Sequence, residues 1–157
     1  MFKHILLPTD GSVLSRRAVA GGLALAKECG ASVVAVHVVP VPHVDQLEAW
    51  LHHDPQFAAH RQALFDKFAD MYLSVVASSA QALQVPCECR KLAANEPYQA
   101  ILEAAEQAGC DLIYMASHGW KGAAHLLGSQ TVKVLHYSQI PVLVHKAGRH
   151  DGNQEAP

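Results

Sequence analysis

Four short runs of consecutive apolar residues constrain the fold of this chain more than any other feature of its sequence. They occupy residues 4–8, 32–40, 111–117 and 140–145, and they are rich in Val, Ile and Leu. Apolar and polar residues do not alternate in them, which is typical of strands that helices cover on both faces, as in a parallel sheet. A fifth run, VPCECRKL at residues 85–92, does alternate and indicates a half-exposed edge strand.

Helical patterns fill the segments between these runs. Apolar residues recur at spacings of three and four in residues 14–29, 56–83 and 95–108, and a short helix is expected over residues 130–137. We assign the apolar stripe of the second of these helices to the core; it comprises Phe57, Leu64, Phe68, Met71 and Val75. The resulting order, βαβαβαβαβ, predicts a doubly wound α/β domain.

Polar residues and proline mark where the helices begin. Asp10 or Ser12 can cap the first helix, and Pro97 lies in the first turn of the third. Ser129 is placed to cap the last helix, whose positive end favours a phosphate group.

Length and charge narrow the class of protein. A chain of 157 residues predicts one domain, and a net charge of −2 excludes the basic surface that nucleic-acid binding requires. No run approaches the ~20 apolar residues of a membrane helix, and no secretory leader is recognisable. The four cysteines form no C-x-x-C pair, so we expect reduced thiols in a cytoplasmic protein without a metal site. The domain is expected over residues 1–146, with a mobile loop at 40–55 and a disordered tail at 147–157.

The expected strand order places two unusual loops side by side. The strand order 3-2-1-4-5 satisfies three conditions together: right-handed crossovers, an edge position for residues 85–92 and a central first strand. Ligands of open α/β sheets bind outside the carboxyl ends of the strands where the winding direction reverses, here between the first and fourth strands. The loops that follow those strands are TDGS at residues 9–12 and the glycine-rich segment 115–131.

The residue types in these loops suit a nucleotide. Gly119, Gly122 and Gly128 allow backbone N–H groups to approach an anion, and the Asp10 carboxylate can accept from ribose hydroxyls. Val38 can offer an apolar wall to a base. The alternative is that the glycines only form turns and that Ser129 only caps a helix. Neither G-x-x-x-x-G-K-[ST] nor G-x-G-x-x-G after the first strand is present.

At these residues the chain resembles the universal stress protein family, over about residues 1–146. The resemblance lies in ILLPTDGS at 5–12, VVAVHVV at 33–39, and MASHG at 115–119 together with LLGSQTVKVLHYSQIPVLV at 126–144. It implies a dimeric α/β protein with the order 3-2-1-4-5. One branch of the family binds ATP through Gly-x2-Gly-x9-Gly-[Ser/Thr], and another branch lacks this motif and binds none.

The resemblance also implies a set of binding residues. Asp10 would hold the ribose, Val38 would meet the adenine through its backbone, and Met115 would pack near the base. The full candidate set is Pro8, Thr9, Asp10, Val38, Met115, Ala116, His118, Gly119, Gly122, Gly128, Ser129 and Gln130. Two departures stand out: Ala116 replaces the first glycine of the motif, and only eight residues separate Gly119 from Gly128. Ala116 is tolerable if its φ is negative, and Gly122 can absorb the shorter spacing.

Three functions follow from these residues, in order. The first is a stress-response module that binds ATP or another adenine nucleotide, with or without Mg²⁺. The second is a nucleotide-free dimeric interaction protein of the same fold. An enzyme ranks third, with no catalytic residues assigned and hydrolysis slow at most, because phosphoryl transfer needs metal and cationic clamps. The apolar edge strand at 140–145 predicts a homodimer through antiparallel pairing of residues 141–145.

Overall fold

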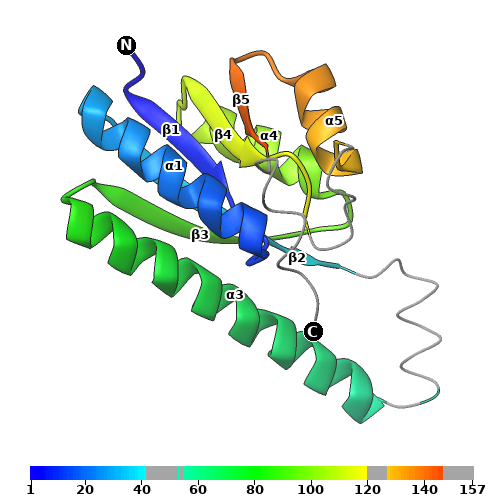
Figure 1. Ribbon diagram of the computed structural model, residues 1–157. Helices are drawn as coiled ribbons and strands as arrows, with labels where there is room; N and C mark the ends of the chain where they lie inside the picture. Colours follow the sequence, from blue (N-terminus) through cyan, green and yellow to red (C-terminus); the bar gives the residue numbers. More distant parts are fainter. Residues whose placement is uncertain (42–52, 54, 120–126, 147–157) are drawn as a thin grey trace.

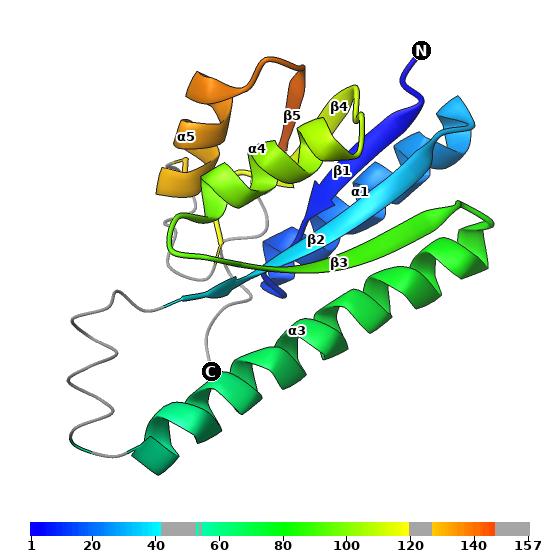
Figure 2. The same cartoon turned by 180° about the vertical axis from the view of Figure 1, so that it is seen from behind.

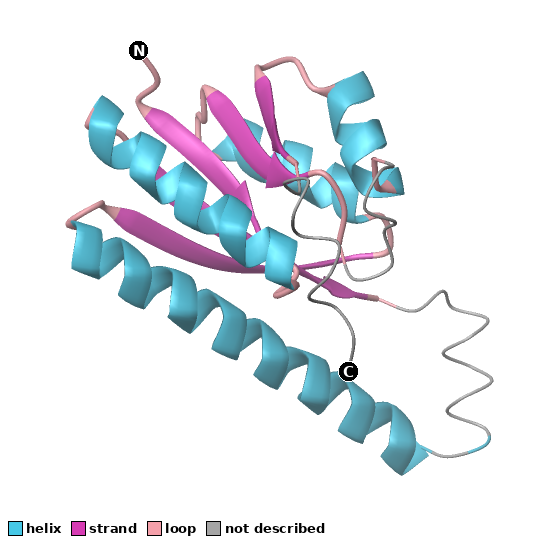
Figure 3. Cartoon of the chain, in the orientation of Figure 1, coloured by secondary structure: helices cyan, strands magenta, loops and turns pink. Residues whose placement is uncertain are grey.

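All five expected strands form one parallel sheet. The computed structural model describes residues 1–41, 53, 55–119 and 127–146, so most of the expected loop 40–55 and all of the tail 147–157 lie outside the described residues. The elements are β1 (His4–Pro8), α1 (Val13–Cys29), β2 (Ser32–Pro40), α3 (Pro55–Leu83), β3 (Cys87–Ala94), α4 (Pro97–Gln107), β4 (Leu112–Ala116), α5 (Ser129–Tyr137) and β5 (Val142–His145). The sheet order is β3-β2-β1-β4-β5, which confirms the predicted doubly wound α/β class (Figures 1 and 3).

Helices cover both faces of the sheet, as the unbroken apolar runs predicted. Helices α1 and α3 lie on the face seen in Figure 1, and α4 and α5 lie on the face seen in Figure 2. Alternate residues of β1 divide between the two layers: Ile5 and Leu7 pack towards α1 and α3, and Leu6 packs towards α4 and α5. All three side chains are fully buried, which places β1 at the centre of the sheet and its carboxyl end in the middle of the molecule.

The two edge strands differ in character. In β3, which begins two residues later than expected, Glu88 and Arg90 form an ion pair, and Lys91 reaches Asp66 and Asp70 of α3. Charged side chains of this kind discourage an edge strand from pairing with another chain. The opposite edge, β5, carries VLVH and no such charges.

The caps of the first and last helices are not alike. Ser12 caps α1, because its Oγ accepts from the N–H of Ser15 at 3.2 Å. At α5 the expected cap is wrong: Gly128 precedes the first turn, the helix starts at Ser129, and no side chain caps it. The N–H of Gly128 donates to the carbonyl of Ser117 at 2.7 Å, and this contact fixes the start of α5 one residue earlier than the sequence suggests.

This difference predicts unequal costs for two similar substitutions. We expect Ser12→Ala to lower the free energy of unfolding by about 1 kcal/mol, since it removes a side-chain cap. Ser129→Ala removes no cap and should change it by less than about 0.5 kcal/mol. Urea unfolding of both variants and of the parent, monitored by circular dichroism, measures the two changes. Equal losses would contradict the assignment.

The apolar stripe of α3 does not belong to the core, which corrects the sequence-based assignment. Phe57, Leu64, Phe68, Met71 and Val75 are between 39% and 55% exposed. The residues that α3 buries are instead Ala69, Leu73, Val76 and Ala80. The helix has two apolar faces with the same spacing, and the face with small alanines allows the closer approach to the sheet. Within the described residues, no helix is both long and apolar enough to span a bilayer.

Candidate functional site

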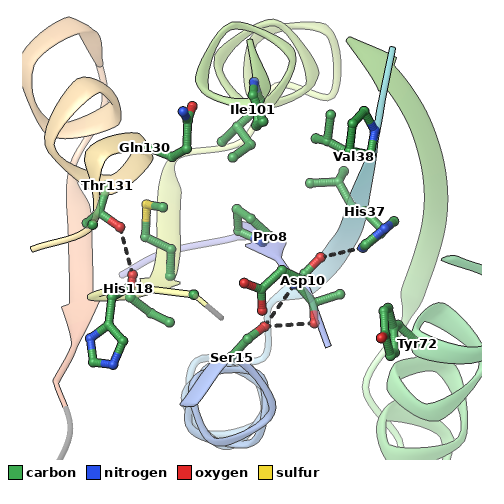
Figure 4. A pocket seen from close by; sticks show the side chains of 18 of the residues that line it. Pro8, Asp10, Ser15, His37, Val38, Tyr72, Ile101, His118, Gln130 and Thr131 are labelled. Atoms are coloured by element: carbon green, nitrogen blue, oxygen red, sulfur yellow. Dashed lines mark hydrogen bonds between the residues drawn. The ribbon is translucent and has the colours of Figure 1, made fainter. Parts of the chain in front are cut away.

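The carboxyl ends of β1 and β4 open into a cavity of about 630 Å³ (Figure 4). This volume lies within the range of small-molecule sites. Eleven of the twelve candidate residues line the cavity, namely Pro8, Thr9, Asp10, Val38, Met115, Ala116, His118, Gly119, Gly128, Ser129 and Gln130. The twelfth, Gly122, lies outside the described residues.

The loop after β1 is held by a compact set of hydrogen bonds. The Oγ of Ser15 contacts Thr9 Oγ1 at 2.8 Å and accepts from the N–H of Asp10 at 3.1 Å. Asp10 Oδ1 accepts from the N–H of Ser12 at 2.9 Å, a turn that fixes the carboxylate. Asp10 therefore stands at the end of β1 with one oxygen engaged in its own loop, and Ser15 is a supporting residue that sequence analysis missed.

The loop after β4 approaches this carboxylate directly. A Cβ placed on Gly119 would collide with Asp10 Oδ2. At Gly128, a Cβ would lie 3.1 Å from the Cα of His118, tighter than ordinary van der Waals contact. The two loops are therefore in contact, and glycine at 119 is required by the proximity of Asp10 rather than by an unusual φ.

Both ends of the loop between β4 and α5 are closed by hydrogen bonds. The N–H of Gly128 donates to the carbonyl of Ser117, and Thr131 Oγ1 donates to the carbonyl of Ala116 at 3.0 Å. These bonds aim the first turn of α5 at the cavity. The N–H groups of that turn have no acceptor within the helix, so an anion is a suitable partner for them.

The opposite wall of the cavity is apolar. Val38 from β2, Ile101 from α4 and Met115 from β4 line it, and Figure 4 shows Val38 and Ile101 on the side away from Ser15. Aliphatic side chains on two sides of a cavity suit a flat aromatic ring. Ile101 was missed because its spacing within α4 identified it only as a core residue.

Gln130 has a structural contact that the sequence did not indicate. Its Oε1 accepts from the N–H of Tyr98 at 2.9 Å, in the first turn of α4. The side-chain oxygen of Gln130 thus caps a neighbouring helix, while the Nε2 amide group of the same side chain takes no part in that bond. A cap supplied by a residue 32 positions away leaves no local sequence signal.

Two histidines border the cavity in different ways. His37 of β2 lines the cavity and donates from Nδ1 to the carbonyl of Thr9 at 2.8 Å (Figure 4). This bond leaves Nε2 of the neutral ring as an acceptor. The His118 ring contacts Ser117 Oγ at 3.1 Å and in Figure 4 turns away from Pro8 and Asp10.

The departure at Ala116 introduces no backbone strain. Ala116 is the last residue of β4, and Gln84 is the only non-glycine residue with a positive φ in the part of the chain that the structure describes. Ala116 therefore has the negative φ that alanine needs at the first glycine position of the motif.

Burial disfavours redox chemistry at two of the four cysteines. Burial raises the pKa of the Cys87 thiol to about 12, and burial likewise raises that of Cys110 to about 11. A thiol with such a pKa carries almost no thiolate at neutral pH, and the thiolate is the reactive form.

Nearly the whole chain matches a known protein family. The model of the Universal stress protein family matches residues 1–146. The chain belongs to the universal stress protein family. A curated universal stress protein of Thermus aquaticus is 37% identical over 147 residues, covering 92% of this chain and 98% of that protein. One from Methanocaldococcus jannaschii is 32% identical, covering 93% of this chain and 83% of that protein.

Several solved structures share the fold, two of them of universal stress proteins. A hypothetical protein whose biochemical function was assigned from its structure matches with a TM-score of 0.76 at 26% identity, over 94% of this chain and 98% of that one. A universal stress protein in complex with cAMP matches with a TM-score of 0.64 at 22% identity, over 92% and 97% of the two chains. One from Archaeoglobus fulgidus in complex with dAMP matches with a TM-score of 0.62 at 18% identity, over 93% and 98%.

Proposed function

We propose that this universal stress protein binds an adenine nucleotide, ATP among them, in the cavity between β1 and β4. The observation that carries the proposal is the contact between Gly119 and Asp10, beside the uncapped first turn of α5. A carboxylate for a ribose and backbone amides for phosphates then face one cavity. The relatives in complex with cAMP and dAMP support the adenine nucleotide as the ligand class.

Each candidate residue has a role in this proposal. Asp10 accepts from the ribose, with Pro8 and Thr9 beside it, and the backbone of Val38 meets the adenine while Met115 packs against it. The phosphates lie on the backbone of residues 119 and 128–130, with Gln130 contributing N–H donors, while its side-chain oxygen accepts from the N–H of Tyr98. Ala116 and His118 line the same cavity.

The cavity favours binding over rapid phosphoryl transfer. Its described lining contains His37 and His118 but neither lysine nor arginine. Phosphoryl transfer relies on cations to neutralise developing charge. Mg²⁺ bound together with ATP would supply such charge, and we propose hydrolysis that is slow at most.

Calorimetry with purified protein tests the proposal. ATP, AMP and cAMP are titrated separately, with and without Mg²⁺, and GTP serves as the matched purine control. We expect saturable binding of adenine nucleotides and weaker binding of GTP. Absence of heat with every adenine nucleotide at millimolar concentration would overturn the proposal.

A nucleotide-free interaction protein is the second candidate, favoured by Ala116 and by the shortened spacing between Gly119 and Gly128. Native protein purified without added ligand is denatured, and its supernatant is analysed by mass spectrometry. Recovery of a stoichiometric adenine nucleotide would exclude this candidate.

We also propose that the chain forms a homodimer through antiparallel pairing of β5. The strand is an edge, and Leu143 at its middle is 38% exposed. An apolar edge strand that carries unpaired backbone groups is a template for another strand.

Leu143→Lys tests the dimer. In an antiparallel pair centred on Leu143, this change places two ammonium groups across the two-fold axis, and like charges directly opposite are destabilising. At micromolar concentration we expect light scattering to fall from twice the chain mass of 16.9 kDa to that mass. Gln139→Lys adds the same charge at an exposed position before the strand and should stay dimeric. A parent protein that is already monomeric would refute the β5 dimer.

A further inference from the structure

The cavity at the carboxyl ends of the strands extends over both faces of the sheet. Two adjacent residues of β2 show this, because successive side chains of a strand point to opposite faces. Val38 packs into the layer of α4 and α5, whereas the ring of His37 lies beside Tyr72 of α3, and both residues line the cavity. The cavity therefore has two lobes. The aliphatic lobe, on the side of α4, is lined by Val38, Ile101 and Met115.

The second lobe has an aromatic wall that the proposed nucleotide site does not use. We define the aromatic lobe by the four rings that line it on the side of α3, namely His37, Phe65, Phe68 and Tyr72. The ring centroids of His37 and Tyr72 are 5.4 Å apart, and those of Phe68 and Tyr72 are 6.1 Å apart with planes at 11°. In Figure 4, His37 and Tyr72 lie on the side of Asp10 that is away from Gln130. No residue assigned to the nucleotide belongs to α3, so this wall is left over.

The rings of the aromatic lobe differ in how much of their surface a ligand can reach. Tyr72 packs against the loop after β1, where a Cβ on Gly11 would collide with its ring. The guanidinium of Arg61 lies over the ring of Phe65, 4.8 Å from the centroid. Phe68 lines the cavity and is still 39% exposed. Phe68 is therefore the ring best placed to receive a ligand.

The chemistry of the aromatic lobe suits a flat ring better than a phosphate. Aromatic faces favour other rings in offset stacks, and every nucleobase presents such a face. Among the described lining residues of the cavity, Asp10 carries the one carboxylate, and neither lysine nor arginine is present. A phosphate in the aromatic lobe would lie near this negative charge without a cation to offset it.

We propose that the aromatic lobe binds the second ring of an adenine dinucleotide, a ligand in which the phosphates join an adenine nucleotide to another nucleoside. The inference rests on the proposed nucleotide site, which places the adenine in the aliphatic lobe and the phosphates at the first turn of α5. Because both lobes belong to one cavity, with Asp10 between them, one ligand with two rings can fill both. The second ring then binds without a second loss of translational freedom.

A comparison of matched ligands tests the aromatic lobe. Calorimetry measures the affinity of the parent protein for ADP, ADP-ribose, NAD⁺ and NADH. ADP-ribose lacks the nicotinamide ring of NAD⁺ and is otherwise the same molecule. We expect both NAD⁺ and NADH to bind at least about fivefold more tightly than ADP-ribose, since stacking of a base on an aromatic side chain has this effect or more. NADH is included because its nicotinamide ring is uncharged.

Substitutions at Phe68 connect the preference to the aromatic wall. Phe68→Leu keeps an apolar side chain and removes the ring, so the preference for NAD⁺ over ADP-ribose should fall to about twofold or less. Phe68→Tyr keeps the ring and should keep the preference. Phe57→Leu makes the same change at another exposed ring of α3, one that does not line the cavity, and should also keep it.

The possible failures of this inference and of the proposed function are distinguishable. Equal affinities of the parent for ADP-ribose, NAD⁺ and NADH would overturn the aromatic lobe as a binding site and leave the adenine nucleotide site intact. A preference limited to NAD⁺ would assign the effect to the positive charge near Asp10, and a preference that survives in Phe68→Leu would place the second ring elsewhere; either result overturns the inference. Absence of binding by all four ligands would overturn the proposed function, and this inference with it.

Discussion

Replacing Gly119 with valine lowers the affinity for ATP by at least about 100-fold, the largest effect expected of any single substitution in the cavity. The new Cβ would collide with Asp10 Oδ2, so either the carboxylate or the loop after β4 must move. Either movement disturbs the proposed charge-assisted contact between Asp10 and the ribose, worth about 1.5–3 kcal/mol. It also misplaces the backbone amides of the loop after β4 that would bind the phosphates. Calorimetry with ATP measures the loss.

The variant needs a control for the added volume alone. Ala77→Val adds two methyl groups at an exposed position of α3, far along the chain from either loop, and should bind ATP as the parent does. Circular dichroism and thermal melting establish that Gly119→Val is folded. An affinity within threefold of the parent would contradict the contact between the two loops as the basis of the site.

Substitution of Asp10 gives the second largest expected loss of nucleotide affinity. The isosteric change Asp10→Asn separates the contribution of its charge from that of its hydrogen bond to Ser12. Asp10→Asn keeps an oxygen that can accept from the N–H of Ser12 but loses the charge, so we expect a loss of about tenfold in affinity. Asp10→Ala loses the turn contact as well, and the loss should approach about 100-fold.

Adenosine is the better ligand for this measurement, because an acidic side chain beside phosphates also repels them. If Asp10 accepts from the ribose, the parent prefers adenosine to 2′,3′-dideoxyadenosine, and Asp10→Ala binds both equally. A preference for the hydroxyls that survives in Asp10→Ala would assign ribose recognition to another residue.

The sheet was predictable because its signals are local and redundant. The unbroken apolar runs at β1, β2 and β4 indicated strands covered on both faces, and the charges at Glu88 and Arg90 indicated an edge. The strand order followed from handedness and edge character together. Because this strand order places the carboxyl ends of β1 and β4 side by side, the contact between the loops that follow them was also predictable.

Other features depend on contacts that sequence spacing does not encode. Both faces of α3 carry apolar residues at helical spacing, and only packing against the sheet decides that Leu73 is buried while Phe68 is exposed. Gln130 was expected among the binding residues and lines the cavity, yet its side-chain oxygen also caps α4. The ring of His37 bonds to the carbonyl of Thr9, 28 positions away in the chain, and such a contact leaves no local signal. The cap of α5 moved to Gly128 because the amide of that glycine bonds to the β4 side of the loop.

The hydrogen bonds from Gly128 to Ser117 and from Thr131 to Ala116 join the start of α5 directly to the end of β4. Because these bonds fix both ends of the connection, residues can be added to it or removed from it without moving the end of β4 or the start of α5. We therefore expect this stretch to accept changes in length and composition while β4 and α5 keep their mutual placement. If the cavity binds a nucleotide as proposed, insertion or deletion at this point can alter the ligand preference without a compensating change in the rest of the fold.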